Sequence, residues 1–251
     1  MRALVYDCSA GISGDMNLAA LIDLGVDRES LERELSKLHV HGEWKLECRR
    51  AQQSGIQGTR IDVLTVEEGH SGHGHAHHHR TMADIRRLIG ASGLSDAVKR
   101  TALSIFSLLA EAEAQVHGTT PEEVHFHEVG ALDSIVDIIG TAILIDMINP
   151  DEIYASVVND GYGFIECQHG QIPVPVPATA EIFSSSNVVS RQIDIDTELV
   201  TPTGAAIIAE LAESYGPAPV MNILKTGYGA GKKNIKIPNV LRVMLGERHE
   251  G

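Results

Sequence analysis

The chain has 251 residues, 43% of them hydrophobic, which is enough to bury a sizeable core in one large domain or two small ones. Its 34 acidic residues outnumber its 20 basic residues and give a formal net charge of −14, so the protein has no general attraction for nucleic acid or for anionic membranes. An anionic ligand therefore needs a dedicated local site, and we expect neither nucleic acid nor a membrane among the partners.

The N-terminal residues and the cysteines favour a cytoplasmic protein. The opening stretch has no signal-peptide profile, and no apolar run approaches the length that spans a membrane. Cys8, Cys48 and Cys167 are odd in number and far apart, which argues against a disulfide framework. We therefore predict reduced thiols and a cytoplasmic location.

The first half of the chain shows clear periodic patterns of apolar residues. In chain order they predict a strand at 2–7, helices over 15–24 and 27–38, strands at 43–52 and 58–67, and helices over 81–90 and 95–117. The two later strands alternate apolar with polar residues around a Gly/Ser turn, so they form a half-solvated hairpin. Asp27 is the expected N-cap of the second helix.

The second half mixes short strands with helices. The patterns predict a short turn from Thr120 to Val124, an apolar helix over 130–148, two strands and a proline-rich extended piece from residue 152, a helix over 177–184, a strand at 187–195, a helix over 201–216, and paired strands at 221–231 and 239–246. Strands and helices alternate without a strict β-α-β rhythm. The predicted fold class is therefore α+β, with one or more mixed sheets and packed helices, and α/β is the alternative.

Residues 69–80, "GHSGHGHAHHHR", differ from the rest of the chain. Histidine alternates with small residues and there is no apolar periodicity, so we expect a disordered, flexible loop. Neutral imidazoles bind Ni, Cu and Zn, and a mobile loop exchanges such ions quickly. We assign this loop to metal handling rather than catalysis, with these candidate ligands: His73, His75, His77, His78 and His79.

The segment "VHFHEVGALDSIVD" gathers imidazoles and carboxylates before an apolar helix. His125 and His127 share one side of an extended piece, Glu128 follows, and Asp133 and Asp137 are one helical turn apart. This set suits either transition-metal binding or general acid–base chemistry. Structural roles are the alternative. Glu128 can interact favourably with the partial positive charge at the start of the following helix, and the aspartates can lie on a solvated face. Apolar residues surround Asp137 in sequence, so its carboxylate needs solvent or a partner.

Two stretches predict a helix N-terminus that could hold an anion such as phosphate. "YDCSAGISGDM" places a glycine-bearing turn before a helix, and "ELVTPTGAA" does the same with hydroxyls. Ordinary capped helices with proline in the first turn are the alternative. The candidate substrate- and phosphate-binding residues, with the two aspartates above, are Asp7, Ser13, Gly14, Asp15, Thr201, Thr203 and Gly204; Asp7, Cys8 and Asp15 are also candidate cation ligands.

Several long motifs together resemble one known family. These are "DCSAGISGDM" with "LIDLGVD", "HFHEVGALDSIVDIIG", "GYGFIECQHGQIPVPVPATAEI", "ELVTPTGAAI", "GYGAG" and "PNVLRVMLG". In this order they resemble the LarC family of nickel insertion proteins, which complete the nickel-pincer nucleotide cofactor of lactate racemase. The resemblance covers nearly the whole chain and is weakest over residues 26–120.

The resemblance implies a nickel chelatase of the lyase class, a cyclometallase. Such proteins install Ni²⁺ between two sulfurs and a ring carbon of pyridinium-3,5-bisthiocarboxylic acid mononucleotide, and they use CTP with Mn²⁺. Nucleotide binding in the family is associated with a C-terminal region, and this chain stops where the N-terminal part of the family would end. We therefore expect residues 1–251 to be the N-terminal nickel-insertion region of the family, without its C-terminal portion. That C-terminal portion is the expected protein partner in the reaction, and the sequence leaves homo-oligomerisation open.

Within this interpretation we assign hypothetical roles to the candidate residues from their chemistry. Glu128 or His127 would accept the ring proton, His125 and His127 would hold nickel, and the phosphate would lie at 13–14 or 201–204. A non-enzymatic nickel carrier or storage protein is the chief alternative. The third hypothesis is a metal-dependent phosphohydrolase that uses Asp7, Asp15, Asp133 and Asp137.

Overall fold

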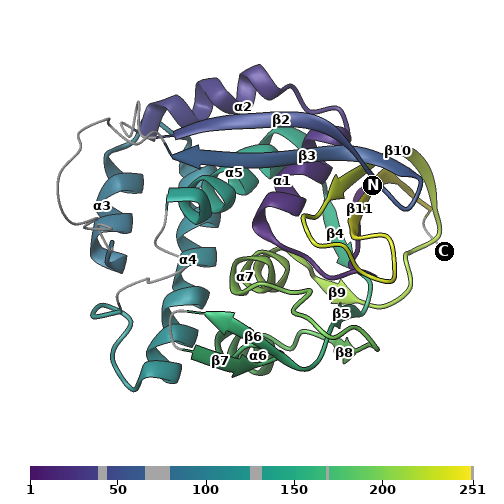
Figure 1. Cartoon of the computed structure of the whole chain (residues 1–251). Coiled ribbons are helices and arrows are strands. Elements are labelled where there is room, and N and C mark those ends of the chain that lie inside the picture. Colours follow the sequence, from purple (N-terminus) through teal and green to yellow (C-terminus); the bar gives the residue numbers. More distant parts are fainter. Residues whose placement is uncertain (39–43, 66–79, 125–131, 168–169, 250–251) are drawn as a thin grey trace, which may run out of the picture.

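A computed structural model describes residues 1–38, 44–65, 80–124, 132–167 and 170–249 of the chain (Figure 1). Within these residues one mixed sheet of seven strands has the order β2-β3-β10-β11-β1-β4-β9. The bounds of its strands are β1 Arg2–Asp7, β2 Trp44–Gln53, β3 Ile56–Thr65, β4 Glu152–Ala155, β9 Ser214–Tyr215, β10 Met221–Ala230 and β11 Val240–Arg248. β1 pairs antiparallel with β11 and parallel with β4, so the sheet is mixed and the predicted α+β class is confirmed.

The described helices are α1 Gly14–Asp23, α2 Arg28–Leu35, α3 Met82–Ala91, α4 Asp96–His117, α5 Leu132–Ile148, α6 Pro177–Ser185 and α7 Pro202–Leu211, with a 3₁₀ turn at Ser36–Leu38. Two small two-stranded sheets complete the described elements: β5 Val158–Asp160 pairs with β8 Ser190–Gln192, and β6 Phe164–Cys167 pairs with β7 Gly170–Pro173. No helix in the described ranges is long and apolar enough to cross a membrane.

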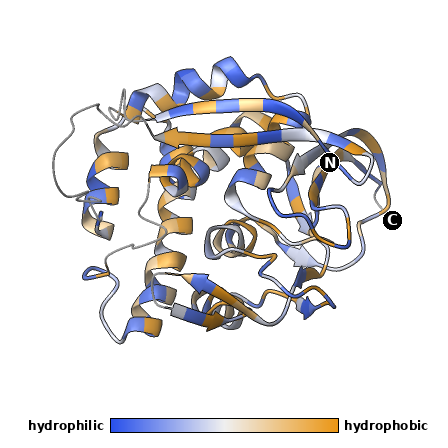
Figure 2. Ribbon diagram, viewed as in Figure 1, coloured by the Kyte–Doolittle hydropathy of each residue, from blue (hydrophilic) through white to orange (hydrophobic). Residues whose placement is uncertain are grey.

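The helices stack in layers on the sheet. α1 packs directly on β3, β10 and β11, α5 packs against α1 and α4, and α4 also contacts α6 and α7 (Figure 1). Figure 2 shows apolar residues along α5 and along much of α4, the two helices at the centre of this stack. Burial on most sides explains why the sequence of α5 is largely apolar, although it includes Asp133, Asp137 and Asp146.

A glycine in β10 lets α1 approach the sheet closely. A Cβ on Gly229 would lie 1.9 Å from the Met16 carbonyl oxygen, far inside contact distance. This contact explains the "GYGAG" stretch in physical terms, because only a residue without a side chain fits between the strand and the helix backbone. The N-terminal end of α1 is thereby held against the sheet.

Most predicted elements are confirmed within one or two residues at their ends, and three regions differ. From residue 152 the structure has four short strands, β4 to β7, where two strands and an extended piece were predicted. The predicted helix over 201–216 ends at Leu211, because Ser214–Tyr215 instead forms β9 and pairs with β4. The predicted strand at 187–195 is only Ser190–Gln192, because the Ile195 amide donates to the Ile193 carbonyl at 2.7 Å and the chain turns there. Tertiary pairing outweighs the local pattern at β9, whereas a local turn ends β8.

Candidate functional site

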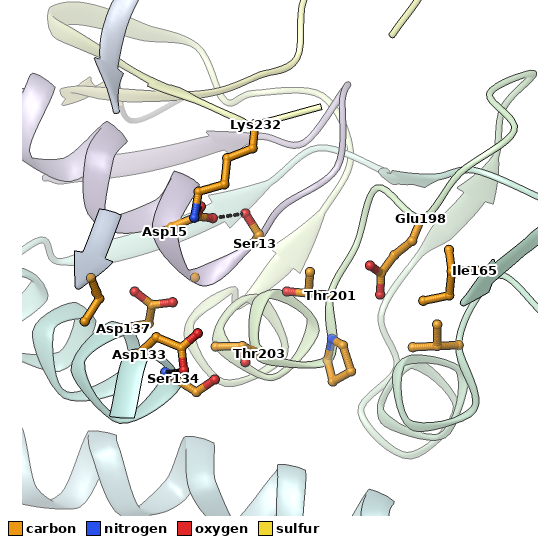
Figure 3. Close-up of a pocket in the computed structure, with 14 residues that line it drawn as sticks. Ser13, Asp15, Asp133, Ser134, Asp137, Ile165, Glu198, Thr201, Thr203 and Lys232 are labelled. Atoms are coloured by element: carbon orange, nitrogen blue, oxygen red, sulfur yellow. Dashed lines mark hydrogen bonds and ion pairs between the residues drawn. The ribbon is translucent and has the colours of Figure 1, made fainter. Parts of the chain in front are cut away.

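One pocket of about 290 Å³ lies where three helices begin (Figure 3). The first turns of α1, α5 and α7 contribute most of its wall, and β3, β6, the N-cap of α6 and the loops before α7 and after β10 supply the rest. The residues that line it are Ser13, Gly14, Asp15, Val63, Asp133, Ser134, Asp137, Ile165, Val176, Glu198, Thr201, Pro202, Thr203 and Lys232.

A backbone bridge holds the starts of α1 and α7 side by side. The Ile12 amide donates to the Leu199 carbonyl at 3.0 Å, and the Thr201 amide donates to the Ile12 carbonyl at 3.2 Å. Gly11 allows this because its φ of +81° is a conformation that residues with side chains rarely adopt. The two loops that the sequence singled out as anion sites are therefore neighbours.

The two helix starts differ in how they are capped. The Thr201 hydroxyl accepts from the Gly204 amide at 3.2 Å and caps α7 as an N-cap residue usually does. The Ser13 hydroxyl instead donates to the Asp15 carboxylate and makes no cap hydrogen bond to α1. The first turn of α1 thus keeps its partial positive charge directed at the pocket, where it favours an anionic ligand.

Lys232 is the cation of the pocket, and the sequence analysis did not include it. Its Nζ lies 3.0 Å from Asp15 Oδ2 and 3.1 Å from Asp62 Oδ1, so it joins the start of α1 to β3. Burial would lower the pKa of Lys232, but these two carboxylates outweigh burial and raise it. The signal in the sequence was "GAGKKN", a pair of lysines in a strongly acidic chain.

Asp137 occupies the floor of the pocket in an unusual environment. The residue is 8% exposed, and its Oδ1 is buried without a hydrogen-bond partner among the described residues. Its carboxylate packs directly on the start of α1, since a Cβ on Gly14 would lie 2.3 Å from Asp137 Oδ2. Burial raises the pKa of Asp137 well above its ordinary value, and repulsion from Asp15 and Asp133 raises it further.

The other carboxylates of the pocket are engaged. Asp15 binds Lys232 and accepts from the Met16 amide at 2.9 Å. Asp133 Oδ1 accepts from the Ser134 amide at 2.8 Å, and Glu198 lies 3.6 Å from the ammonium group of Lys233. Asp137 is therefore distinguished from its acidic neighbours by its lack of such contacts.

A second buried aspartate, Asp160, holds the backbone that precedes α7 in the wall of the pocket. Asp160 Oδ1 accepts from the backbone amides of Leu199 at 2.8 Å and Val200 at 3.1 Å, which fixes the chain just before α7. Burial raises the pKa of Asp160, although these amide hydrogen bonds oppose the shift. Sequence reasoning missed this role, for which "NDG" between two expected strands was the available signal.

The structure brings together most of the predicted binding residues: Ser13, Gly14, Asp15, Asp133, Asp137, Thr201 and Thr203 line the pocket. Two predicted residues do not line it. Asp7 forms an ion pair with Arg242 and accepts from the Ser9 amide at 3.2 Å, and Gly204 packs against the Ile12 backbone, where a Cβ would meet the carbonyl oxygen at 2.2 Å. Their contacts are those of structural residues, and a direct binding role for them stays a prediction.

The predicted catalytic and nickel-binding residues lie outside the described residues: His73, His75, His77, His78, His79, His125, His127 and Glu128. Among the residues that the structure does describe, no group of three or more His, Cys, Asp or Glu side chains could hold a metal ion. The described carboxylates of the pocket therefore do not by themselves form such a group.

Comparison with known proteins gives a consistent result. Residues 4–251 match the family described as nickel insertion protein. The chain is 66% identical over its full length to a pyridinium-3,5-bisthiocarboxylic acid mononucleotide nickel insertion protein of Akkermansia muciniphila, of which it spans 61%. Proteins of the same name from Acetivibrio thermocellus and Clostridium kluyveri are 49% and 51% identical over 100% and 99% of the chain, which spans 61% and 63% of them. No solved structure matches the chain significantly.

Proposed function

The chain belongs to the family of nickel insertion proteins, and on that premise we propose that it inserts Ni²⁺ into pyridinium-3,5-bisthiocarboxylic acid mononucleotide. The chain spans less than two thirds of the length of the relatives that carry this name. The proposal therefore concerns the part of the reaction that residues 1–251 perform as one nickel-insertion region. Nickel is a substrate of this reaction.

The observation that carries the proposal is the mixed charge of one pocket. The start of α1 and Lys232 offer positive charge, and Asp15, Asp133 and Asp137 offer negative charge a short distance away (Figure 3). The proposed ligand has the same mixture, because it carries an anionic phosphate, two anionic thiocarboxylates and a cationic ring. A helix N-terminus with a lysine suits the phosphate, and the carboxylates suit the cationic ring and the incoming metal.

We assign the phosphate to the amides at Ser13–Gly14 and to the start of α7 at Thr201–Thr203, with Lys232 as its counter-ion. His125 and His127 stay the proposed nickel ligands, since imidazole nitrogen binds Ni²⁺ well, and the histidines of 69–80 are proposed to supply the ion. Asp133 in the pocket wall follows this His-Glu segment closely in the sequence. Glu128 and His127 stay candidates for the proton acceptor, and a Glu128→Gln variant with full activity would remove Glu128.

The finer features are part of the proposal as well. We propose a chelatase of the lyase class that works in the cytoplasm and depends on CTP and Mn²⁺ through a C-terminal region of the kind that the resemblance implies. The described residues offer no set of side chains that fits Mn²⁺. No step of the reaction is therefore assigned to manganese or to CTP in this pocket.

A nickel carrier is the second candidate, and the histidine-rich stretch at 69–80 favours it. A carrier needs only loosely held metal and no ligand pocket. The pocket favours an enzyme over a carrier, because it contains the buried carboxylate of Asp137, whose Oδ1 has no hydrogen-bond partner among the described residues. A phosphohydrolase would use several of the same aspartates but gives no reason for the histidines.

The decisive experiment mixes the chain with Ni²⁺ and the metal-free mononucleotide and looks for the metallated nucleotide by mass spectrometry. Parallel reactions add a C-terminal region from a relative, CTP and Mn²⁺, singly and together. We expect metallated product in at least the complete mixture and none when the chain is left out. Release of inorganic phosphate without metallation would instead support the hydrolase, and nickel binding without product in any mixture would support the carrier.

A further inference from the structure

Asp137 is the group in the pocket that the proposed function has not yet used. It is buried at the floor, it faces the ligand space, and its Oδ1 has no hydrogen-bond partner among the described residues. A buried carboxylate without a partner costs free energy, so it is not explained by the stability of the fold. Such a group is often kept for its chemistry.

The chemistry of the ligand supplies a need for such a group. Substituents at ring positions 3 and 5 flank carbon 4, so a metal ion that binds both sulfurs lies next to the hydrogen on that carbon. If nickel also bonds to the carbon, the C–H bond breaks as the C–Ni bond forms, and the hydrogen leaves as a proton. The electron pair of the C–H bond passes to the C–Ni bond, nickel stays Ni²⁺, and one proton acceptor is required.

Resting on the proposed function, we infer that Asp137 is the general base that receives this proton. The groups that face it are Asp15 from α1, Asp133 from its own helix and Lys232 from the loop after β10 (Figure 3). Asp15 forms an ion pair with Lys232, and Asp133 accepts a hydrogen bond from a backbone amide, so both of these carboxylates are already engaged. A proton taken up by Asp137 removes a buried charge, whereas one taken up by the other two breaks existing contacts.

The environment of Asp137 makes it a stronger base than an ordinary carboxylate. Burial raises its pKa, with the nearby carboxylates adding to the effect, and a carboxylate with a raised pKa binds a proton more strongly. The contact with Gly14 fixes where the carboxylate lies, because Asp137 Oδ2 packs against the start of α1. The ligand phosphate at that helix start and the ring at the carboxylate would then occupy one continuous space.

The test compares Asp137→Asn with Asp133→Asn in the full reaction mixture of the proposed function. We expect Asp137→Asn to bind the mononucleotide within about threefold of the unmodified chain but to form the nickel–carbon product at least ~100-fold more slowly, the usual loss when a general base is removed. Asp133→Asn removes the same charge beside Asp137 and should slow the reaction less than Asp137→Asn does. A Glu128→Gln variant that loses the product while Asp137→Asn keeps it would assign the proton to Glu128 instead.

Two further measurements separate a base from a structural residue. The rate of metallation by the unmodified chain should rise with pH as Asp137 ionises and then level off, and Asp137→Asn should lose this dependence. In Asp137→Ala, added formate should restore part of the rate, because a small carboxylate can enter the vacated space and accept the proton. A positioning residue would show neither response.

The results also separate this inference from the proposed function. If the unmodified chain metallates the nucleotide and Asp137→Asn does so within threefold, the inference is wrong and the function stands. Loss of mononucleotide binding in Asp137→Asn, without formate rescue of Asp137→Ala, likewise assigns Asp137 to binding alone. If no mixture with the unmodified chain gives product, both the function and the inference fail.

Discussion

Among the residues of the pocket, Asp137 is the one whose buried charge most clearly lowers the stability of the fold. Its ionised form is buried against two other acidic side chains, with Lys232 as the one cation among the groups that shift its pKa. The same carboxyl in the unfolded chain is solvated and ionises with its ordinary pKa of about 3.9. The folded state therefore retains a proton over a pH range in which the unfolded state has lost it.

The sign of this linkage gives a prediction for Asp137→Asn. Because the folded pKa is raised, the stability that the protonated carboxyl supports is complete below the unfolded pKa and is lost as pH rises toward the folded pKa. The asparagine variant has no such loss, so its melting temperature should exceed that of the unmodified chain by about 2 °C or more at pH 8, a shift of roughly 1 kcal/mol in a chain of this size. The difference should shrink toward pH 4.

Thermal unfolding from pH 4 to pH 8.5 checks this, with Asp133→Asn as the matched control. Asp133 has a backbone partner, and its variant should show little pH-dependent gain. A variant at position 137 that is less stable than the unmodified chain at pH 8 would show that the carboxylate stabilises the fold.

The position of Lys232 leads to a prediction about ligand binding. Lys232→Gln removes the cation between Asp15 and Asp62, so binding of a mononucleotide phosphate should weaken by about fivefold, roughly 1 kcal/mol, at low salt. Lys236→Gln is the control with the same charge change, because that side chain is 73% exposed and pairs only with Asp194 at the surface. Calorimetric titration at two salt concentrations measures both, and equal weakening in the two variants would place the phosphate elsewhere.

At the scale of elements, close packing of α1 on the sheet fixes the pocket. Gly229→Ala would put a methyl group 1.9 Å from the Met16 carbonyl, and backbone must move to accommodate it. We expect a loss of about 2–3 kcal/mol in the free energy of unfolding. In Gly90→Ala the methyl group meets nothing within 4 Å, and the variant should be more stable by a few tenths to ~1 kcal/mol because alanine favours the helix.

Urea denaturation of the two glycine variants tests this packing. A Gly229→Ala protein as stable as the unmodified chain would mean that α1 can separate from β10 at little cost. The start of α1 would then be free to shift in the pocket.

The sequence predicts elements well where the information is local. The hairpin of β2 and β3 follows from alternation and a Ser54–Gly55 turn, and Asp27 caps α2 as expected by accepting from the Ser30 amide. The overlong helix after Thr201 shows the limit, because the Glu213 amide donates to the Ile153 carbonyl at 2.9 Å and draws the chain into the sheet. That partner is distant in sequence, so no local pattern contains it.

The residues of the pocket likewise divide into those that local sequence patterns predict and those that depend on contacts between distant parts of the chain. Ser13 and Thr201 were predicted because a helix start carries its own signature of glycine, proline and hydroxyl residues. Lys232 was not, because its contact with Asp15 depends on how β10 is placed beside α1. Asp137 was recognised as needing a partner or solvent, but only the fold shows that its Oδ1 has no partner among the described residues.

At the scale of the whole molecule, an acidic protein has many of its histidines in one short stretch and charges of both signs in one pocket. The net charge of −14 attracts divalent cations to the surface as a whole, and the histidines of 69–80 are the proposed nitrogen ligands for nickel. We expect loading and insertion to be separable functions of the same chain.

Deletion of residues 70–79 tests this division. The variant should bind fewer nickel ions at equilibrium dialysis, and at limiting nickel it should metallate more slowly. With excess nickel its metallation rate should recover to within about threefold of the unmodified chain, because the pocket is intact. Complete loss of product even with excess nickel would mean that the stretch takes part in insertion itself.

The bridge between Ile12 and Val200 also means that the pocket forms only after the chain has been synthesised beyond Val200. Its walls come from Ser13 and Lys232, which lie far apart in the sequence. The histidines of 69–80 are synthesised before Lys232, so a growing polypeptide carries them before it can fold the pocket. A fragment that ends before Lys232 would keep these histidines but lack a wall of the pocket.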